Sequence, residues 1–137
     1  MSKICGVGIS SNVATFVILN GSRSDFVIEE SKFKKNKLSE EKSQDNIRSF
    51  SAAIQDMFRQ NDIERVFVKR PSTGMYQAKH PAFKIEALIQ LSDVEVKLLP
   101  SQTITAFLKK NPGIEELYSK VLKYQSDALQ AAYCGLD

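Results

Sequence analysis

The residues with the most evident chemical potential are cations near the middle of the chain. Lys69 and Arg70 end the apolar segment 65–70 (RVFVKR), and Lys79 and Lys84 follow shortly after it. Ammonium and guanidinium groups bind phosphate through charge and hydrogen bonds. If 65–70 is a strand of a parallel sheet, it ends where such sheets bind ligands. These four residues are therefore candidate phosphate ligands. We expect no bound metal or cofactor, since cations do not ligate metal ions.

The segment 71–81 connects this strand to the next helix, and a loop of such length in a small domain is often functional. Tyr76 within it could stack on a nucleobase or fold back onto the sheet. His80, the single histidine, is typical of a surface loop residue.

Each cation also has a purely structural interpretation. Lys69 and Arg70 could cap the sheet as a solvated pair, and Glu86 could pair with Arg70 or Lys84 or face water. The polar segment 31–39 is either a solvated connector or a flexible arm that contacts phosphate. Its lysines are Lys32, Lys34, Lys35 and Lys37. The serines have no histidine or aspartate at a spacing that indicates nucleophilic catalysis.

Length and composition favour one domain over residues 1–137. Hydrophobic residues make up 42% and charged residues 26% of the chain, which is ordinary for a globular protein. No apolar run could span a bilayer and the chain start does not read as a signal peptide, so we expect a cytoplasmic protein without a membrane partner. Cys5 and Cys134 lie in separate apolar segments, which predicts reduced core thiols. The net charge of +3 permits an anionic partner without requiring one.

Apolar segments near the start of the chain predict three strands, at 3–10, 13–19 and 25–30. Short polar turns separate them, which favours an antiparallel meander. A helix with Ser39 as its N-cap follows and should end near Asn61, with one apolar stripe for packing on the sheet.

The second half of the chain alternates strands and helices. The strand at 65–70 follows a helical crossover, which favours a position parallel to the first strand. Another helix, a strand at 95–99, a helix capped by Ser101 and further short helices complete the chain. This order predicts an α/β, ribonuclease H-like fold. Its five-stranded mixed sheet has three antiparallel and then two parallel strands, with helices on both faces.

The run at 83–91 (FKIEALIQL) is the most distinctive part of the chain. Together with Cys5-Gly6-Val7, Val68-Lys69-Arg70 and Leu98-Leu99, it resembles a short bacterial family of unknown function, number three thousand and ten in the domain-of-unknown-function series. The resemblance covers nearly the whole chain and implies no established activity.

A more remote resemblance is to Holliday-junction resolvases of the RuvC type. Their first strand is similar to Ile4-Cys5-Gly6-Val7 followed by an aspartate, and their fourth strand ends in a glutamate. Their last helix carries two aspartates before a pair like Ala128-Leu129. The resemblance implies that these carboxylates hold two magnesium ions for phosphodiester cleavage, since hard cations need anionic oxygen ligands.

The sequence departs from this pattern at three of the four positions. Gly8, Lys69 and Tyr124 stand where the resemblance implies carboxylates, and only Asp127 remains. One carboxylate that faces a lysine cannot hold two magnesium ions. If the fold brings Lys69 and Asp127 together, an ion pair would occupy that remaining carboxylate.

We therefore predict a catalytically inactive ribonuclease H-like domain. It would bind the phosphates of nucleic acid or a nucleotide at the C-terminal edge of strands 3–10 and 65–70. The alternative is a protein-interaction or dimerisation module, such as a homodimer, without a nucleic-acid role; a metal-dependent nuclease is the least favoured. A continuous positive surface around Lys69 would favour the first function, and scattered charge with an exposed apolar face the second.

Overall fold

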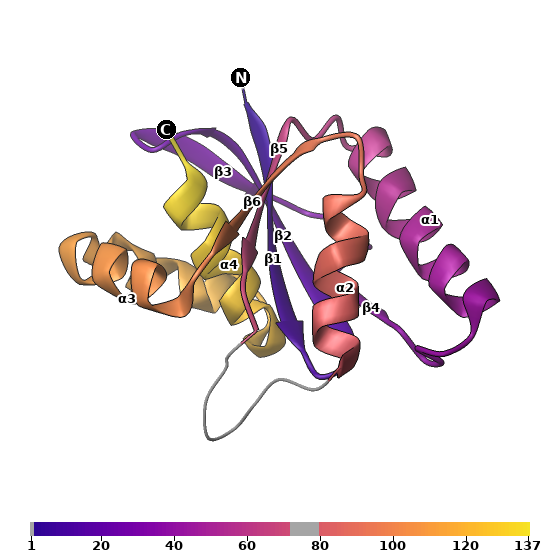
Figure 1. Cartoon of the computed structure of the whole chain (residues 1–137). Helices are drawn as coiled ribbons and strands as arrows, with labels where there is room; N and C mark the ends of the chain where they lie inside the picture. The colour runs from indigo at the N-terminus through magenta and orange to yellow at the C-terminus, as the bar shows by residue number, and fades with distance from the viewer. Residues whose placement is uncertain (1, 72–79) are drawn as a thin grey trace.

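Figure 1 shows the computed structural model of the chain, which describes residues 2–71 and 80–137. The described residues form a six-stranded mixed sheet. Five strands lie in the order β3-β2-β1-β5-β6, and the short strand β4 pairs with β2 on the same side as β3. The strands are β1 (Lys3–Ser10), β2 (Val13–Ser22), β3 (Asp25–Glu29), β4 (Lys35–Lys37), β5 (Arg65–Lys69) and β6 (Glu95–Leu99).

The pairing confirms the predicted antiparallel meander and its two parallel additions. β1 is antiparallel to β2, and β2 is antiparallel to β3. β5 lies parallel to β1 with Val68 opposite Val7, and β6 lies parallel to β5. Parallel neighbours need a crossover connection, which α1 (Gln44–Gln60) supplies before β5 and α2 (His80–Gln90) before β6.

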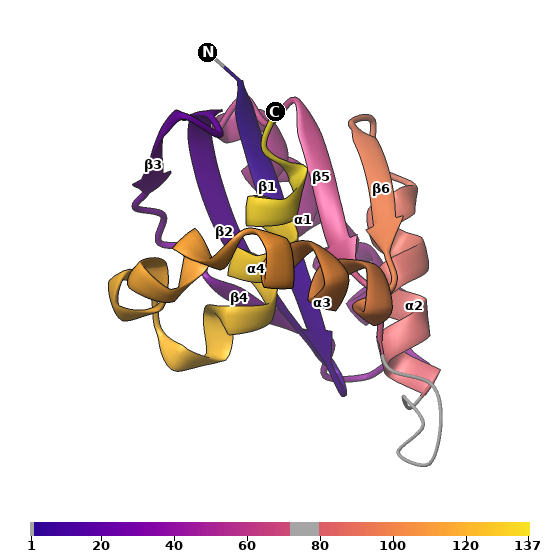
Figure 2. The same ribbon diagram turned by 90° about the vertical axis from the view of Figure 1, so that its left-hand side faces the viewer.

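Helices cover both faces of the sheet, as predicted. α1 and α2 lie on one face, and α3 (Ser101–Lys110) and α4 (Ser126–Gly135) on the other (Figures 1 and 2). Two 3₁₀ segments, η1 (Pro112–Lys120) and η2 (Lys123–Gln125), connect α3 to α4. No helix of the described residues has both the length and the apolar character needed to cross a membrane.

Each face has its own apolar core, because successive side chains of a strand point to opposite faces. From β1, Cys5 and Val7 enter the core beneath α1 and α2, whereas Ile4 enters the core beneath α4. From β5, Val68 belongs to the first core and Phe67 to the second. The alternation therefore decides which residues at the strand ends face α4.

α4 packs against β1 without intervening side chains. A Cβ atom on Gly6 would lie 2.0 Å from the carbonyl oxygen of Ala128 and 2.5 Å from the backbone nitrogen of Ala132. Any larger residue at position 6 would push the helix away from the sheet. The glycine therefore sets the short distance between α4 and the middle of β1.

The segment 31–39, interpreted from sequence as a solvated connector or a flexible arm that contacts phosphate, contains β4, a strand that the sequence did not predict. Lys35–Lys37 pairs with Val13–Thr15 of β2, and the backbone N–H of Leu38 donates to the carbonyl oxygen of Asn12. Three consecutive polar residues carry no apolar alternation, so the sequence pattern gave no strand signal. Backbone pairing along the free edge of β2 formed this strand.

Two predicted helix caps are wrong. α1 begins directly after Ser43, whose hydroxyl, and not that of Ser39, accepts a hydrogen bond from the backbone N–H of Asn46. The residues before it form a turn closed by the backbone of Glu40 and Ser43. Ser101 is itself the first residue of α3 and makes no side-chain cap. Several polar residues near a helix start can serve as caps, so local sequence does not choose among them.

The two cysteines are free thiols, Cys5 buried in β1 and Cys134 half-buried in α4. Burial raises the pKa of both thiols above the ordinary cysteine value, because desolvation penalises the thiolate.

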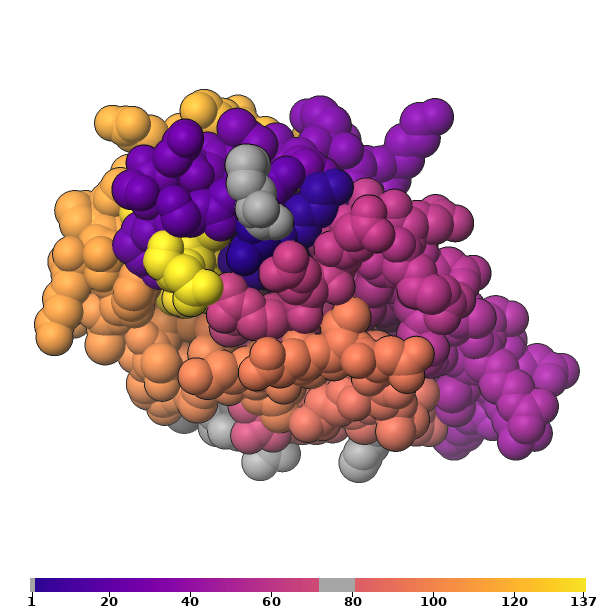
Figure 3. All heavy atoms as spheres, turned by 90° about the horizontal axis from the view of Figure 1, so that it is seen from above, coloured from indigo at the N-terminus to yellow at the C-terminus, as the bar shows by residue number. Residues whose placement is uncertain are grey.

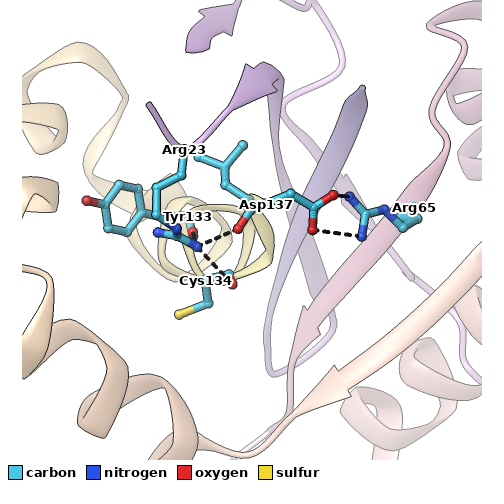
Figure 4. A network of polar contacts seen from close by, with 6 residues as sticks. Arg23, Arg65, Tyr133, Cys134 and Asp137 are labelled. Carbon is cyan, nitrogen blue, oxygen red and sulfur yellow. Dashed lines mark hydrogen bonds and ion pairs between the residues drawn. The ribbon is translucent and has the colours of Figure 1, made fainter. Parts of the chain in front are cut away.

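Arg23, in the turn between β2 and β3, fixes the C-terminal end of α4 (Figure 4). Its Nη2 atom donates to the backbone oxygens of Tyr133 (3.2 Å), Cys134 (3.4 Å) and Leu136 (2.6 Å). The guanidinium carbon lies 4.6 Å from the ring centroid of Phe107. A positive charge at the C-terminus of a helix also interacts favourably with the helix dipole.

Asp137 adds a second anchor at this end of α4. Its Oδ2 atom lies 2.7 Å from Nη2 of Arg65 on β5, and its backbone oxygen accepts from the N–H of Arg23 at 2.6 Å. Figure 3 shows the C-terminal residues, in yellow, beside the start of β1, in indigo. With this end fixed, the first turn of α4 lies at the opposite ends of β1 and β5.

Candidate functional site

Residues from β5 and α4 form a polar cluster at the C-terminal ends of β1 and β5. Lys69, the last residue of β5, points to the α4 face because it lies two residues after Phe67. Its Nζ atom donates to Oδ1 of Asp127 at 2.9 Å and to Oε1 of Gln130 at 3.0 Å. Gln130 in turn donates from Nε2 to the hydroxyl of Tyr118 at 3.0 Å. The ion pair that the sequence left conditional is therefore present.

The two partners of this pair differ in exposure. The side chain of Lys69 is 22% exposed and that of Asp127 is 49% exposed. Asp127 also lies in the first turn of α4, where a negative charge interacts favourably with the helix dipole. The lysine is therefore held by two acceptors, while half of the carboxylate remains in contact with water.

Gly8 lies in contact with the same turn of α4. A Cβ atom at this position would lie 2.7 Å from Cβ of Asp127, 2.9 Å from Oγ1 of Thr15 and 3.0 Å from the backbone nitrogen of Ala128. Thr15 fills the remaining side by donating from Oγ1 to the carbonyl oxygen of Gly8 at 3.3 Å. The space that a side chain at position 8 would need is therefore already occupied.

The four positions do not fit a pair of magnesium ions. Gly8 offers no ligand, Lys69 is a cation, and the one carboxylate, Asp127, is bound to that cation. Tyr124 lies on the same pocket wall as Asp127 and is 41% exposed. Among the residues that the structure describes, no three side chains of His, Cys, Asp or Glu come close enough together to hold a metal ion.

Arg70 forms a two-pronged ion pair with Glu86 of α2. Nε and Nη2 of Arg70 lie 3.2 Å and 3.1 Å from the two carboxylate oxygens. Only 6% of the Glu86 side chain is exposed, against 46% of Arg70. The hydrogen bonds that Arg70 donates to Glu86, followed by the negative charge of Glu86, raise the pKa of Arg70 above its ordinary value. Of the three interpretations of Glu86, the structure selects the pair with Arg70.

Lys84, another predicted phosphate ligand, pairs with Glu41 and makes no contact with this cluster in the described hydrogen bonds. Nζ of Lys84 donates to the backbone oxygen of Glu41 at 2.6 Å and to its carboxylate at 2.9 Å. Tyr76 and Lys79 lie outside the described residues, and His80 is the first residue of α2. Each described candidate cation therefore has a carboxylate partner: Lys69 has Asp127, Arg70 has Glu86 and Lys84 has Glu41.

The structure also shows a basic pocket that the sequence had not indicated. It measures about 680 Å³ and opens between β4, the end of β1, the start of β2, η2 and the start of α4. We call it the lysine pocket; its lining residues with charged or aromatic side chains are Lys35, Lys37, Lys123, Tyr124 and Asp127. The signal in the sequence was the lysine run at 32–37, but only pairing of β4 with β2 directs two of these lysines to one face.

Solved structures with a similar fold include Holliday-junction resolvases. RuvC from Thermus thermophilus aligns with a TM-score of 0.69 at 12% identity, over 96% of this chain and 91% of that chain. The same protein in complex with a Holliday junction substrate gives 0.68 at 11% identity, over 97% and 91%. The fowlpox virus resolvase in complex with Holliday junction DNA gives 0.51 at 14% identity, over 96% and 92%. At these identities the likeness confirms the ribonuclease H-like fold.

Comparison with curated proteins gives no match. A family model, in contrast, matches residues 2–135, which is nearly the full chain, and confirms the first resemblance inferred from the sequence. The family is described as a protein of unknown function, DUF3010, and the chain belongs to it.

Proposed function

We propose that this protein is a catalytically inactive member of the ribonuclease H-like superfamily that binds phosphate groups of nucleic acid or a nucleotide. The ion pair between Lys69 and Asp127 is the observation that carries the first half of the proposal. It occupies the one carboxylate left at the expected metal positions, and the contacts around Gly8 leave no room for a second. Two-metal cleavage needs several carboxylates around each ion, so this arrangement supports loss of nuclease activity.

Two observations support phosphate binding. The neighbours of similar fold include resolvases solved with Holliday junction substrates, which makes nucleic acid the first ligand class to test. The lysine pocket shares Tyr124 and Asp127 with the vestigial site formed by Gly8, Lys69, Tyr124 and Asp127, and three lysines line the pocket. Lys69, Arg70 and Lys84 could contribute only by exchanging a carboxylate partner for phosphate.

The alternative, a protein-interaction module such as a homodimer, has less support. The most exposed large apolar side chains of the described residues lie on separate elements: Val27 on β3, Leu91 after α2 and Leu122 before η2. Interaction faces of stable complexes instead gather apolar side chains in one patch. Sedimentation of the pure protein at increasing concentration would detect a dimer and shift the balance to this alternative.

The inactive site is tested by calorimetric titration with magnesium and manganese. We expect no specific heat at millimolar metal, because the residues present cannot clamp two ions. Asp127→Asn serves as the matched control, since it preserves the shape of the side chain. Metal uptake by the native protein that disappears in Asp127→Asn would contradict the proposal, as would metal-dependent cleavage of a Holliday junction that the same substitution abolishes.

Phosphate binding is tested by fluorescence anisotropy with labelled DNA and RNA at low salt. Binding should weaken steeply as salt increases, because lysines that contact phosphates displace condensed counterions. Lack of binding to every single- and double-stranded probe at low salt would remove the nucleic-acid hypothesis and leave the protein-interaction alternative.

A further inference from the structure

The lysine pocket combines three cations with one aromatic ring. Lys35 and Lys37 alternate with Asn36 along β4, and the Asn36 amide donates to the backbone oxygen of Phe50 in α1, on the opposite face of the sheet. The two lysines therefore project toward η2 and the start of α4, which supply Lys123 and Tyr124. The walls come from segments far apart in the chain, and the volume of about 680 Å³ lies within the range of small-molecule sites.

The charge of the pocket is uncompensated. Among the described residues that line it, Asp127 is the only acidic one, and Lys69 already pairs with that carboxylate. None of the ion pairs between described residues includes Lys35, Lys37 or Lys123, and all three side chains are exposed. Three like charges around one concavity repel one another, and an anion with several oxygens relieves this repulsion.

Tyr124 gives the pocket a second property. Nζ of Lys35 lies 4.9 Å from the centroid of its ring, which places a cation beside the ring. The residue is 41% exposed, so part of its surface is open to a ligand. A ring placed in this way next to lysines is suited to stack on a nucleobase while the lysines contact the adjoining phosphates.

The geometry points to a nucleotide unit as the ligand of the lysine pocket, with its base on Tyr124 and its phosphates on Lys35, Lys37 and Lys123. This inference rests on the proposed function and specifies its site. A base inside a duplex is stacked on both faces and cannot reach the ring, so single strands bind more tightly than duplexes. The unit comes either from a free nucleotide or from a single strand.

The charge contribution is tested with a triple variant, Lys35→Gln, Lys37→Gln and Lys123→Gln. The control removes three exposed lysines that do not line the pocket, Lys97→Gln, Lys109→Gln and Lys110→Gln, so that both variants have the same net charge. The probe is a fluorescein-labelled oligothymidylate. The pocket variant should reduce the slope of log affinity against log salt by about 2, since each phosphate contact on a single strand contributes about 0.7. The control variant should keep the native slope.

The aromatic contribution is tested with Tyr124→Ala and Tyr124→Phe. The alanine variant should weaken oligothymidylate binding about tenfold, and the phenylalanine variant should restore binding because it keeps the ring. An oligomer of abasic phosphodiester units should bind both variants equally, because it has no base to stack. Competition with thymidine monophosphate and with the oligothymidylate paired to its complement distinguishes a free nucleotide, a single strand and a duplex.

The outcomes separate this inference from the proposed function. If the native protein binds nucleic acid and the two triple variants weaken binding equally, the lysine pocket is not the site, although the proposed function stands. Tighter binding of the duplex than of the single strand, or equal binding by Tyr124→Ala and the native protein, would also overturn the inference. Lack of binding by the native protein to every probe would contradict both the inference about the lysine pocket and the proposed phosphate-binding function.

Discussion

Replacement of Lys69 by methionine removes one partner of the ion pair with Asp127 in the proposed vestigial site and keeps a side chain of similar length. The change leaves Asp127 and Gln130 without their donor at 2.9 and 3.0 Å. Asp127→Leu removes the other partner, and the double variant removes both. The free energies of unfolding of the four proteins form a double-mutant cycle that isolates the interaction between the two residues.

The exposure of the two side chains sets the expected magnitude. An exposed ion pair contributes about 0.2–1 kcal/mol, whereas loss of one partner of a buried pair costs about 3–5 kcal/mol. Lys69 is 22% and Asp127 49% exposed, so the pair lies between these limits, and we expect an interaction energy of about 1–2 kcal/mol. For a chain of 137 residues, each kcal/mol corresponds to about 3–4 °C in Tm.

Urea denaturation followed by circular dichroism measures the cycle. The pair Lys34 and Glu30 is the control, because its atoms lie 3.9 Å apart and the Glu30 side chain is 88% exposed. Its interaction energy should stay below about 0.5 kcal/mol. If the Lys69 and Asp127 variants are additive within the error of the control cycle, the lysine is not held by the carboxylate, and our account of the vestigial site is refuted.

Three further predictions concern the surroundings of the site. Gly8→Asp should lower Tm without producing manganese uptake, because its Cβ would lie 2.7 Å from Cβ of Asp127; a melt stabilised by manganese would contradict this. Arg70→Met should cost about 2–3 kcal/mol by leaving the buried Glu86 carboxylate unpaired, and adding Glu86→Leu should recover most of the loss in urea denaturation. The raised pKa of the Cys5 thiol keeps its proton in the folded chain, whereas the unfolded chain loses it above the ordinary cysteine pKa. Above the ordinary cysteine pKa, the free energy of unfolding of the native protein should therefore fall with increasing pH by up to about 1.4 kcal/mol per pH unit more than that of Cys5→Ala. Equal pH dependence of the two proteins would refute this prediction.

The sequence predicted each strand of the sheet that contains a run of apolar residues. β1 and β6 have the predicted bounds, and the crossovers before β5 and β6 predicted their parallel pairing. β4 could not be predicted, because Lys35–Lys37 has no apolar residue and depends on hydrogen bonds to the edge of β2. Helix caps failed for a related reason, since Ser39 and Ser43 are equivalent in local sequence.

For the candidate site, too, some features could be predicted from the sequence and others required the tertiary structure. The sequence by itself determined that three of the four expected carboxylates are absent, since that depends only on which residues occupy Gly8, Lys69 and Tyr124. It also determined the order of strands that brings their ends to one edge. Both conclusions depend on residue identity and local pattern alone.

Only the tertiary structure decided which cations are neutralised and which are not. Lys69 and Asp127 are 58 residues apart in the chain, and Arg70 meets a glutamate 16 residues away. Lys35 and Lys37 instead face Lys123 across the pocket that β4 and η2 form together. A salt bridge or a binding pocket depends on distances of a few ångströms between distant segments. For Lys69 and Asp127 this distance is set when α4 packs on the glycines of β1, and for Lys35 and Lys37 the position is set when β4 pairs with β2.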